Sequence, residues 1–167
     1  MSATAHPAIA MRPFLPADAP LLAEIFRASI EELTADDYSD AQREAWASVA
    51  DDEAAFGGRL AQQLTLVGTM EGSPVGFVSL RGPETIDMLY VHPAAGEHGV
   101  ATMLVDALEK LAAARGAGKL TADVSDSALD FFRKRGFVPQ TRNSRPVGDE
   151  WLANTTMEKK LPAKEKA

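Results

Sequence analysis

The chain has 167 residues, 46% of them hydrophobic and 25% charged, which is typical of one globular domain with its own core. A formal net charge of −7 argues against a nucleic-acid partner, because nucleic-acid binding normally requires a basic face. The absence of cysteine excludes disulfides, thiol nucleophiles and thiolate metal sites, and we expect no metal. No stretch approaches the roughly 20 apolar residues that span a bilayer, so we expect a soluble, cytoplasmic protein without a membrane partner.

The first 62 residues predict one short strand followed by three helices. Residues 9–14 are expected to form the strand, and Asp18 can cap the first helix. Its apolar residues recur at helical spacing: Leu21, Leu22, Ile25, Phe26, Ile30 and Leu33. Ser39 and Gln42 fit a capping box for a second helix that carries Trp46, and residues 51–53 begin a third helix that runs through Leu60.

Alternating apolar residues then predict a hairpin and a central strand. Residues 64–70 and 74–80 are strand-like and are separated by Glu71-Gly72-Ser73, which favours an antiparallel hairpin. Residues 85–91 are apolar enough for a central strand. A helix over residues 99–114 has one apolar face, made of Val100, Met103, Leu104, Ala107, Leu108 and Leu111.

The C-terminal part predicts a strand at residues 119–124 and a short helix through Arg135, capped by Ser125 or Ser127 and ended by Gly136. Strands at residues 137–141 and 154–161 are expected to flank a polar loop that contains Arg142, Arg145 and Pro146. This order of elements favours an α/β sandwich with a mixed sheet. We expect a single domain over residues 1–167, with a core at 9–161 and flexible tails at 1–8 and 162–167.

A glycine-bearing loop lies between the predicted central strand and the predicted helix that follows it. Free N–H groups at a helix start and the helix dipole favour an anion there, and Gly96 and Gly99 lack the Cβ atom that would keep an anion from the backbone. A cofactor that carries a pyrophosphate is the ligand this arrangement favours. A strand-to-helix turn without a ligand is the alternative for such a short glycine pattern.

Two motifs resemble those of one enzyme family. Residues 89–93 are followed by Gly96, Gly99 and Ala101, at the three specified positions of the pattern Gln/Arg-x-x-Gly-x-Gly/Ala, and two of the three agree. Residues 128–137 match the pattern Ala-x-x-(Phe/Leu)-Tyr-x-x-x-Gly-Phe except that Phe132 replaces the tyrosine. From about residue 9 to 161 the chain resembles the GNAT superfamily of N-acetyltransferases. Segments 38–46 and 125–132 are most similar to its YafP-like branch.

This resemblance implies a mixed, mostly antiparallel central sheet flanked by helices, with acetyl-CoA as the acetyl-donor cosubstrate. It also implies a set of cofactor-binding residues, through main-chain groups above all. They are Leu89, Tyr90 and Val91 on the strand, Gly96, Glu97, His98, Gly99, Val100, Ala101 and Thr102 in the loop and first helical turn, and Ser125, Ala128, Phe131 and Phe132. Sheet packing is the alternative role for Leu89, Tyr90 and Val91.

Acetyl transfer to an amine needs a base for the nitrogen and benefits from an acid for the departing sulfur. Asp87 is the first candidate for the base and Glu84 the second, and a solvated surface carboxylate is the alternative role of Asp87. Phe132 cannot donate a proton, so the acid would be Tyr90, Tyr38, Ser125 or water, unless the thiolate leaves unassisted.

Further polar and aromatic residues have weaker expected roles. Tyr38, Gln42 and Trp46 are candidates for the acceptor pocket, with core packing the alternative for Trp46. His92 is expected to be structural and His98 to contribute only its amide. Arg133 and Arg135 are expected to form a solvated helix face, with a contact to the CoA 3′-phosphate as the alternative.

We therefore expect an N-acetyltransferase that acts directly on an amine-bearing small molecule or peptide. A non-catalytic acyl-CoA-binding or sensor module, which kept the groove and lost the acid at Phe132, is the alternative. A nucleotide-binding protein is disfavoured because the glycine loop follows several strands and no P-loop pattern occurs. The sequence leaves a homodimer open.

Overall fold

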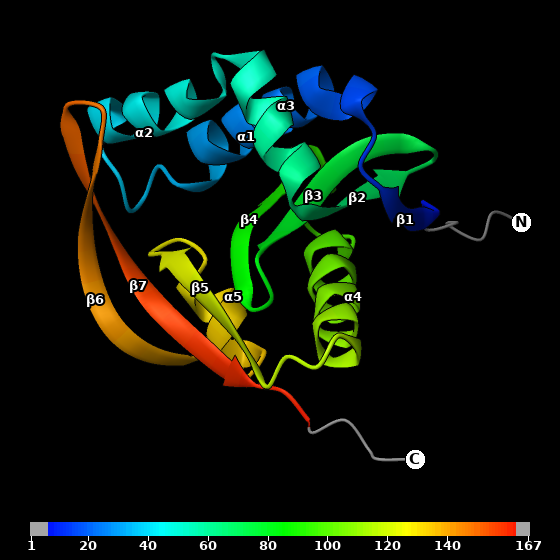
Figure 1. Cartoon of the computed structure of the whole chain (residues 1–167). Coiled ribbons are helices and arrows are strands. Elements are labelled where there is room, and N and C mark those ends of the chain that lie inside the picture. Colours follow the sequence, from blue (N-terminus) through cyan, green and yellow to red (C-terminus); the bar gives the residue numbers. More distant parts are fainter. Residues whose placement is uncertain (1–6, 163–167) are drawn as a thin grey trace, which may run out of the picture.

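The computed structural model describes residues 7–162 of the chain, in which a central sheet lies between two layers of helices (Figure 1). The seven strands are β1 (Ile9–Pro13), β2 (Leu64–Met70), β3 (Ser73–Arg81), β4 (Thr85–Val91), β5 (Lys119–Ser125), β6 (Val138–Val147) and β7 (Glu150–Lys160). They follow the order β1-β2-β3-β4-β5-β7-β6, and within the described residues β4 and β5 are the pair that runs parallel. This confirms the predicted mixed, mostly antiparallel sheet.

Two groups of helices cover the sheet. They are α1 (Ala19–Leu33), α2 (Asp40–Ala47) and α3 (Glu53–Gln62) on one face, and α4 (Val100–Ala114) and α5 (Leu129–Lys134) on the other. On the first face Phe26, Phe56 and Phe77 form a buried aromatic group, with ring centroids 5.4 and 6.2 Å apart along the series. On the second face Leu104 and Phe137 are fully enclosed. Each such side chain contributes about 1.5–3 kcal/mol by leaving water.

Short-range sequence signals explain where several elements begin. The hydroxyl of Ser39 accepts from the amide of Gln42 at 3.1 Å and the Gln42 side chain accepts from the amide of Ser39 at 2.9 Å, which confirms the capping box of α2. Asp52 caps α3 by accepting from the amide of Ala55 at 3.0 Å. Glu71 and Gly72 have φ angles of 50° and 83°, the left-handed pair that a two-residue hairpin turn requires.

Asp18 occupies the N-cap position of α1, as predicted, but its side chain does not cap the helix. Arg12 of β1 donates to both carboxylate oxygens of Asp18 at 2.8 Å, and the amide of Leu15 donates to one of them, so the carboxylate turns away from the start of α1. Leu21 and Leu33 were expected on the apolar face of α1 but are 46% and 50% exposed, because they lie at the edges of the stripe that Leu22, Ala23, Ile25, Phe26 and Ile30 bury.

The predicted polar loop around Arg142 and Pro146 is also wrong, since β6 and β7 form one long hairpin that turns at residues 148–149. Most of β6 is exposed because it is the edge strand, so its sequence shows no apolar alternation. An edge strand also tolerates Pro139 and Pro146, which cannot donate to a ladder. In Figure 1 the hairpin, orange and red, curves along one side of the molecule to α2, where the Gln42 side chain donates to the carbonyl of Trp151 at 2.8 Å.

Neither predicted serine is the N-cap of α5, which is Ala128. Ser125 accepts from the amide of Ala128 at 3.2 Å, one turn before the helix, whereas Ser127 donates to Asp37 at 2.7 Å. Most of the expected flexible tails lies outside the described residues, but Ala8 is tied to the β2–β3 turn. Its amide donates to the Glu71 side chain and its carbonyl accepts from the Glu71 amide, both at 2.9 Å.

The position of the site depends on how little β4 and β5 pair. Within the described chain their register comprises Thr85 with Thr121 and Ile86 with Ala122. From Asp87 on β4 and Asp123 on β5 the two strands separate. Beyond that point the main-chain groups of β4 that face away from β3 have no strand beside them in the described structure, which opens the middle of the sheet.

Candidate active site

A cavity of about 80 Å³ lies where β4 and β5 separate. It is lined from both strands and from α2 and the start of α5, by Trp46, Ile86, Asp87, Leu89, Tyr90, Ala122, Asp123, Val124, Ser125, Ala128 and Phe132. We call it the split cavity. It brings together the predicted residues Asp87, Leu89, Tyr90, Ser125, Ala128 and Phe132 with the predicted acceptor-pocket residue Trp46.

A second cavity of about 160 Å³ shares Trp46, Tyr90, Asp123 and Ser125 with the split cavity. Its other lining residues come from the loop before α2 and from the β6–β7 hairpin: Tyr38, Arg145, Val147, Leu152, Ala153 and Asn154. We call it the hairpin cavity. Tyr38 and Trp46, both predicted to bind the acceptor, lie here together, whereas Gln42 lines neither cavity.

The glycine loop leads from the end of β4 into α4. His92 lies at the end of β4, and its Nδ1 accepts from the amide of Ala94 at 3.1 Å, which fits the expected structural role. The amides of Gly96 and His98 donate to the carbonyls of Pro93 and Ala95 at 3.2 and 3.3 Å. The amides of the first turn of α4, from Val100 to Thr102, have no acceptor within the helix, and free amides at a helix start favour an anion.

Gly99 is the residue that turns the chain into α4. Its φ of 77° is left-handed, and a Cβ atom added there would meet no atom within 4 Å. The space beside the Cα atom of Gly99 is therefore open. Glu97, His98 and Thr102 are exposed around it, whereas the side chain of Val100 is buried in the core.

Asp87 is held by three side chains. Arg59 donates to its two oxygens at 2.8 and 2.9 Å, Gln63 donates at 2.8 Å and Arg81 at 3.2 Å, and the Asp87 side chain is only 5% exposed. Burial alone would raise the pKa of Asp87, but the hydrogen bonds from Arg59 and Gln63 and the two guanidinium charges outweigh burial and lower it. Asp87 is thus a stabilised anion, which weakens it as a base.

Asp123 is the other carboxylate of the split cavity, and the sequence analysis missed it. It follows the last paired residue of β5, Ala122, as Asp87 follows the last paired residue of β4, and both line the split cavity. Its oxygens accept from Thr156 at 2.5 Å and from Arg145 at 3.1 Å, and its side chain is 41% exposed. A sequence signal for its position was available. Leu120, Ala122 and Val124 alternate along β5 and are buried, so Asp123 lies on the opposite face of the strand.

Three candidate proton donors lie at the cavities with different partners. The Tyr38 hydroxyl donates to the carbonyl of Ala153 at 2.6 Å and accepts from the amide of Asp126 at 2.9 Å, so its proton is held in the structure. The Tyr90 hydroxyl accepts from Trp46 Nε1 at 3.2 Å, and burial raises the pKa of Tyr90. Ser125 accepts from the Ala128 amide, which leaves its own proton for another acceptor.

Phe132, which replaces the expected tyrosine, is 4% exposed and packs edge-to-face on its neighbours. Its ring centroid lies 5.4 Å from that of Phe131 and 5.0 Å from that of Phe137. The phenyl ring closes the α5 side of the split cavity but supplies no proton.

The remaining candidates lie away from both cavities. Glu84 lies before Thr85 at the paired end of the strands, where its carbonyl accepts from the Thr121 amide at 2.7 Å. Arg133 is exposed beside Asp130, as expected. Arg135 is not part of a solvated face: it pairs with Asp106 of α4 and lies 5.9 Å from the Phe131 ring centroid.

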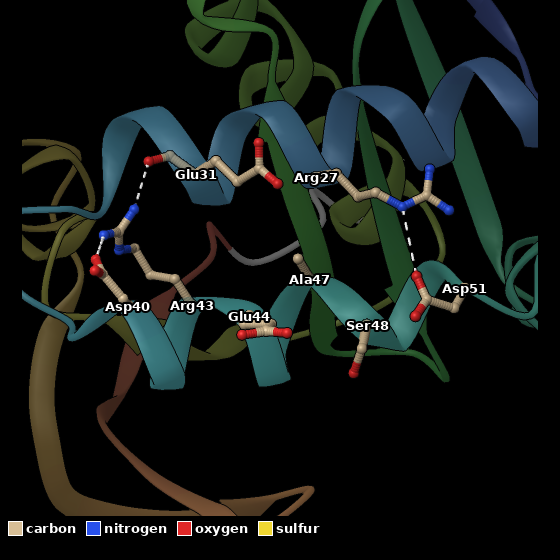
Figure 2. Close-up of a pocket in the computed structure, with 8 residues that line it drawn as sticks. All are labelled: Arg27, Glu31, Asp40, Arg43, Glu44, Ala47, Ser48 and Asp51. Atoms are coloured by element: carbon tan, nitrogen blue, oxygen red, sulfur yellow. Dashed lines mark hydrogen bonds and ion pairs between the residues drawn. The ribbon is translucent and has the colours of Figure 1, made fainter.

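A larger cavity of about 380 Å³ lies between α1 and α2 (Figure 2). Its lining is mostly charged, and both of its arginines pair within it: Arg27 lies 3.7 Å from Asp51, and Arg43 bonds Asp40 and the carbonyl of Glu31. It contains none of the motif residues, so we do not assign the site to it.

In the part of the chain from 7 to 162 no helix is long and apolar enough to span a membrane. Over the same range no three histidine, aspartate or glutamate side chains gather as a metal site would require.

Comparison with known proteins agrees with this geometry. Residues 34–161 match the model of the acetyltransferase (GNAT) domain. YafP of Escherichia coli (strain K12), named an uncharacterized N-acetyltransferase, is 32% identical over 149 residues, which cover 89% of this chain and 94% of YafP.

Solved structures extend the comparison. A GCN5-related N-acetyltransferase from Rhodopseudomonas palustris, whose name also includes "aminotransferase, class-II", is 60% identical with a TM-score of 0.90 and covers 96% of this chain and 99% of its own. PaiA N-acetyltransferase from Thermoplasma acidophilum, solved with coenzyme A, has the same fold with a TM-score of 0.78 at 20% identity over 92% of this chain and 99% of its own. The match over residues 34–161 and the identity with YafP lead to one conclusion: this chain belongs to the GNAT family of acetyltransferases.

Proposed function

We propose that this protein transfers an acetyl group from acetyl-CoA directly to a primary amine of a small molecule or peptide. The observation that carries the proposal is the separation of β4 from β5, which leaves an unpaired edge on β4 with a cavity between the two strands. The same strand leads through the glycine loop to the free start of α4. Coenzyme A or acetyl-CoA is present in solved relatives of this fold, PaiA and YncA from Salmonella typhimurium.

The residues of this chain fit acetyl-CoA along its length. The first-turn amides of α4 and the open space at Gly99 suit a pyrophosphate. The main-chain groups of Leu89 to Val91 on the open edge of β4 can pair with the amides of an extended ligand, as an added strand would. One N–H of this segment can polarise a carbonyl placed in the split cavity.

When bound, acetyl-CoA supplies an acetyl group activated as a thioester. Transfer forms a nitrogen–carbon bond and breaks a carbon–sulfur bond, so one proton must leave the amine nitrogen and one must reach the sulfur. We assign the second proton to the hydroxyl of Ser125, which lines the split cavity with Phe132 and is reprotonated from water. Tyr90 keeps its proton because burial raises its pKa, and it orients the acceptor.

Asp87 has a positioning role in this proposal. Its lowered pKa and its pairing with Arg59 and Arg81 make it a poor proton acceptor, so the proton of the amine leaves to solvent. The carboxylate instead fixes β4 to α3 at the point where the sheet opens. This sets the strand edge against which the ligand pairs.

The first experiment is calorimetric titration with acetyl-CoA, with free CoA, ATP and NAD as comparison ligands. We expect micromolar binding of acetyl-CoA, and at about 100 times its dissociation constant the unfolding free energy should rise by about 2.7 kcal/mol. Preference for ATP or NAD, or no binding, would contradict the proposal. A panel of primary amines with detection of the released thiol then tests turnover, and binding without turnover on any amine would favour the non-catalytic acyl-CoA-binding module.

A matched pair of variants tests the glycine loop. Gly99→Glu places charge and bulk at the helix start and should abolish acetyl-CoA binding. Gly99→Ala carries the same strained φ without the charge, so it should retain binding within about tenfold. Equal affinity of the two variants would remove the loop from the binding site.

A further inference from the structure

We propose that Asp123 selects the acceptor, by accepting hydrogen bonds from the ammonium group of a compact primary amine that enters the hairpin cavity. The inference rests on the proposed function, because it names the group that recognises the acceptor of that reaction. It concerns a residue in neither of the two motifs on which the family resemblance rests.

Neighbouring side chains hold Asp123 as an acceptor. Asn143 Nδ2 donates to Thr156 Oγ1 at 2.8 Å, so Thr156 directs its single proton to Asp123 Oδ1 at 2.5 Å. The second carboxylate oxygen accepts from Arg145 at 3.1 Å. An ionised carboxylate has about four lone-pair positions, so these two contacts leave room for an ammonium group.

The ion pair with Arg145 does not block this binding. The side chains of Asp123 and Arg145 are 41% and 54% exposed, and exposed ion pairs of this kind contribute little to stability. An incoming ammonium group can therefore share or displace the guanidinium at small cost. Asp87, by contrast, is closed to a ligand by Arg59, Arg81 and Gln63.

The other wall of the hairpin cavity is aromatic. Trp46 lies edge-to-face with Tyr38 and Tyr90, at centroid distances of 5.4 and 6.3 Å, and all three line the cavity. Aromatic rings beside a carboxylate suit an alkylammonium, since they attract the cation and cover its apolar body. From these rings an uncharged alcohol of the same shape gains only the covering of its apolar body.

The position of Asp123 also suits transfer. It lines both cavities, together with Trp46, Tyr90 and Ser125, so an amine held there lies next to the split cavity where the acetyl group is expected. Asp123 is thus a specificity residue on β5, oriented by the β6–β7 hairpin through Asn143 and Thr156.

The two tryptophans of the chain make a direct test feasible without turnover. Trp46 lines the cavity and donates through Nε1 to Tyr90, whereas Trp151 is 61% exposed and lines neither cavity, so the indole N–H signals in an NMR spectrum report two different places. The protein is titrated at pH 7 with n-butylammonium and, separately, with n-butanol. We expect a saturable shift of the Trp46 signal with butylammonium and at least tenfold weaker binding of butanol.

Variants then assign the effect to the carboxylate. Asp123→Asn should weaken butylammonium binding at least tenfold, and Thr156→Val should weaken it less, because it removes one orienting hydrogen bond. Asp51→Asn is the control: it removes the same charge from the groove between α1 and α2 (Figure 2) and should leave binding unchanged. With an acceptor from the amine panel, Asp123→Asn should raise the KM for the amine at least tenfold and leave the KM for acetyl-CoA unchanged.

Three results would overturn the inference: no shift of Trp46 with butylammonium, equal binding of butanol, or unchanged affinity in Asp123→Asn. Loss of acetyl-CoA binding with intact butylammonium binding would contradict the proposed function but not the role of Asp123. The two proposals therefore fail separately.

Discussion

Asp87 carries a negative charge at a place where its side chain is 5% exposed, and three donors stabilise that charge. Asp87→Asn leaves Arg59 and Arg81 without their counter-charge, and we expect it to lower the unfolding free energy by about 2 kcal/mol at pH 7, between the values for buried and exposed pairs. Because the pKa is lowered in the folded state, this contribution is complete above about pH 4 and is lost as the pH falls through the folded pKa.

Urea unfolding of the wild-type protein and of Asp87→Asn at pH 7, 5 and 3 checks this, and the difference in unfolding free energy should be smaller at pH 3 than at pH 5. Activity separates the two roles of Asp87. A positioning carboxylate should cost less than about tenfold in kcat, whereas a general base contributes about 100- to 10,000-fold. A loss of that size in a variant of normal stability would make Asp87 the base after all.

Ser125 and Phe132 line the split cavity together and test the source of the proton for the departing sulfur. Ser125→Ala should lower kcat about 100-fold, the ordinary contribution of a general acid, with little change in the KM for acetyl-CoA. The matching rescue is Phe132→Tyr in the Ser125→Ala background, which returns a hydroxyl to the same cavity and should recover much of the loss. Steady-state kinetics with thermal melts checks both, because Ser125 also accepts from the Ala128 amide. Unchanged kcat in Ser125→Ala would mean that the thiolate leaves unassisted or takes its proton elsewhere.

At the scale of the elements, the close packing of α4 on the sheet depends on two paired glycines, Gly68 of β2 and Gly76 of β3. A Cβ atom on Gly68 would lie 2.9 Å from Val100 Cγ1, and one on Gly76 would lie 3.1 Å from that atom and from the carbonyl of Tyr90. The start of α4 can approach the sheet because these side chains are missing. Gly76→Ala should therefore lower stability by about 1–3 kcal/mol and weaken acetyl-CoA binding by displacing the first turn of α4.

Gly58→Ala is the matched control in α3, since its Cβ would meet no atom within 4 Å. It should raise stability by about 0.5–1 kcal/mol, because alanine favours a helix interior over glycine. Urea unfolding and calorimetry of both variants distinguish crowding from a general effect of alanine. Equal stability of the two variants would rule out the close approach of α4.

Local signals were enough to predict most elements before the structure was known. The capping box of Ser39 and Gln42 and the turn at Glu71 and Gly72 each depend on a few adjacent residues. The β6–β7 hairpin was missed because pairing with a neighbour, and not an apolar period, makes β6 a strand. The roles of Asp123 and Arg145 were missed for the same reason: strand pairing between distant segments brings them to a cavity that Trp46 also lines.

For the molecule as a whole, burial is concentrated at the centre of the sheet. In β3 the side chains from Phe77 to Leu80 are at most 1% exposed, and β2 and β4 flank the strand. β6 is the edge strand and is mostly exposed. Native-state hydrogen exchange should therefore find amides of β3 that exchange about 100-fold more slowly than those of β6. Equal protection would mean that the edge opens only with global unfolding.

The short pairing between β4 and β5 divides the sheet into two parts. They are joined near Thr85 and Thr121, whose hydroxyls lie 3.2 Å apart. The glycine loop and β4 belong to one part of the sheet, and Asp123 and Ser125 belong to the other. A small change in the angle between β4 and β5 displaces residues far from the paired positions more than residues close to them. We therefore expect substitutions at Thr85 and Thr121 to change the rate and selectivity of the enzyme, although neither side chain lines the two cavities.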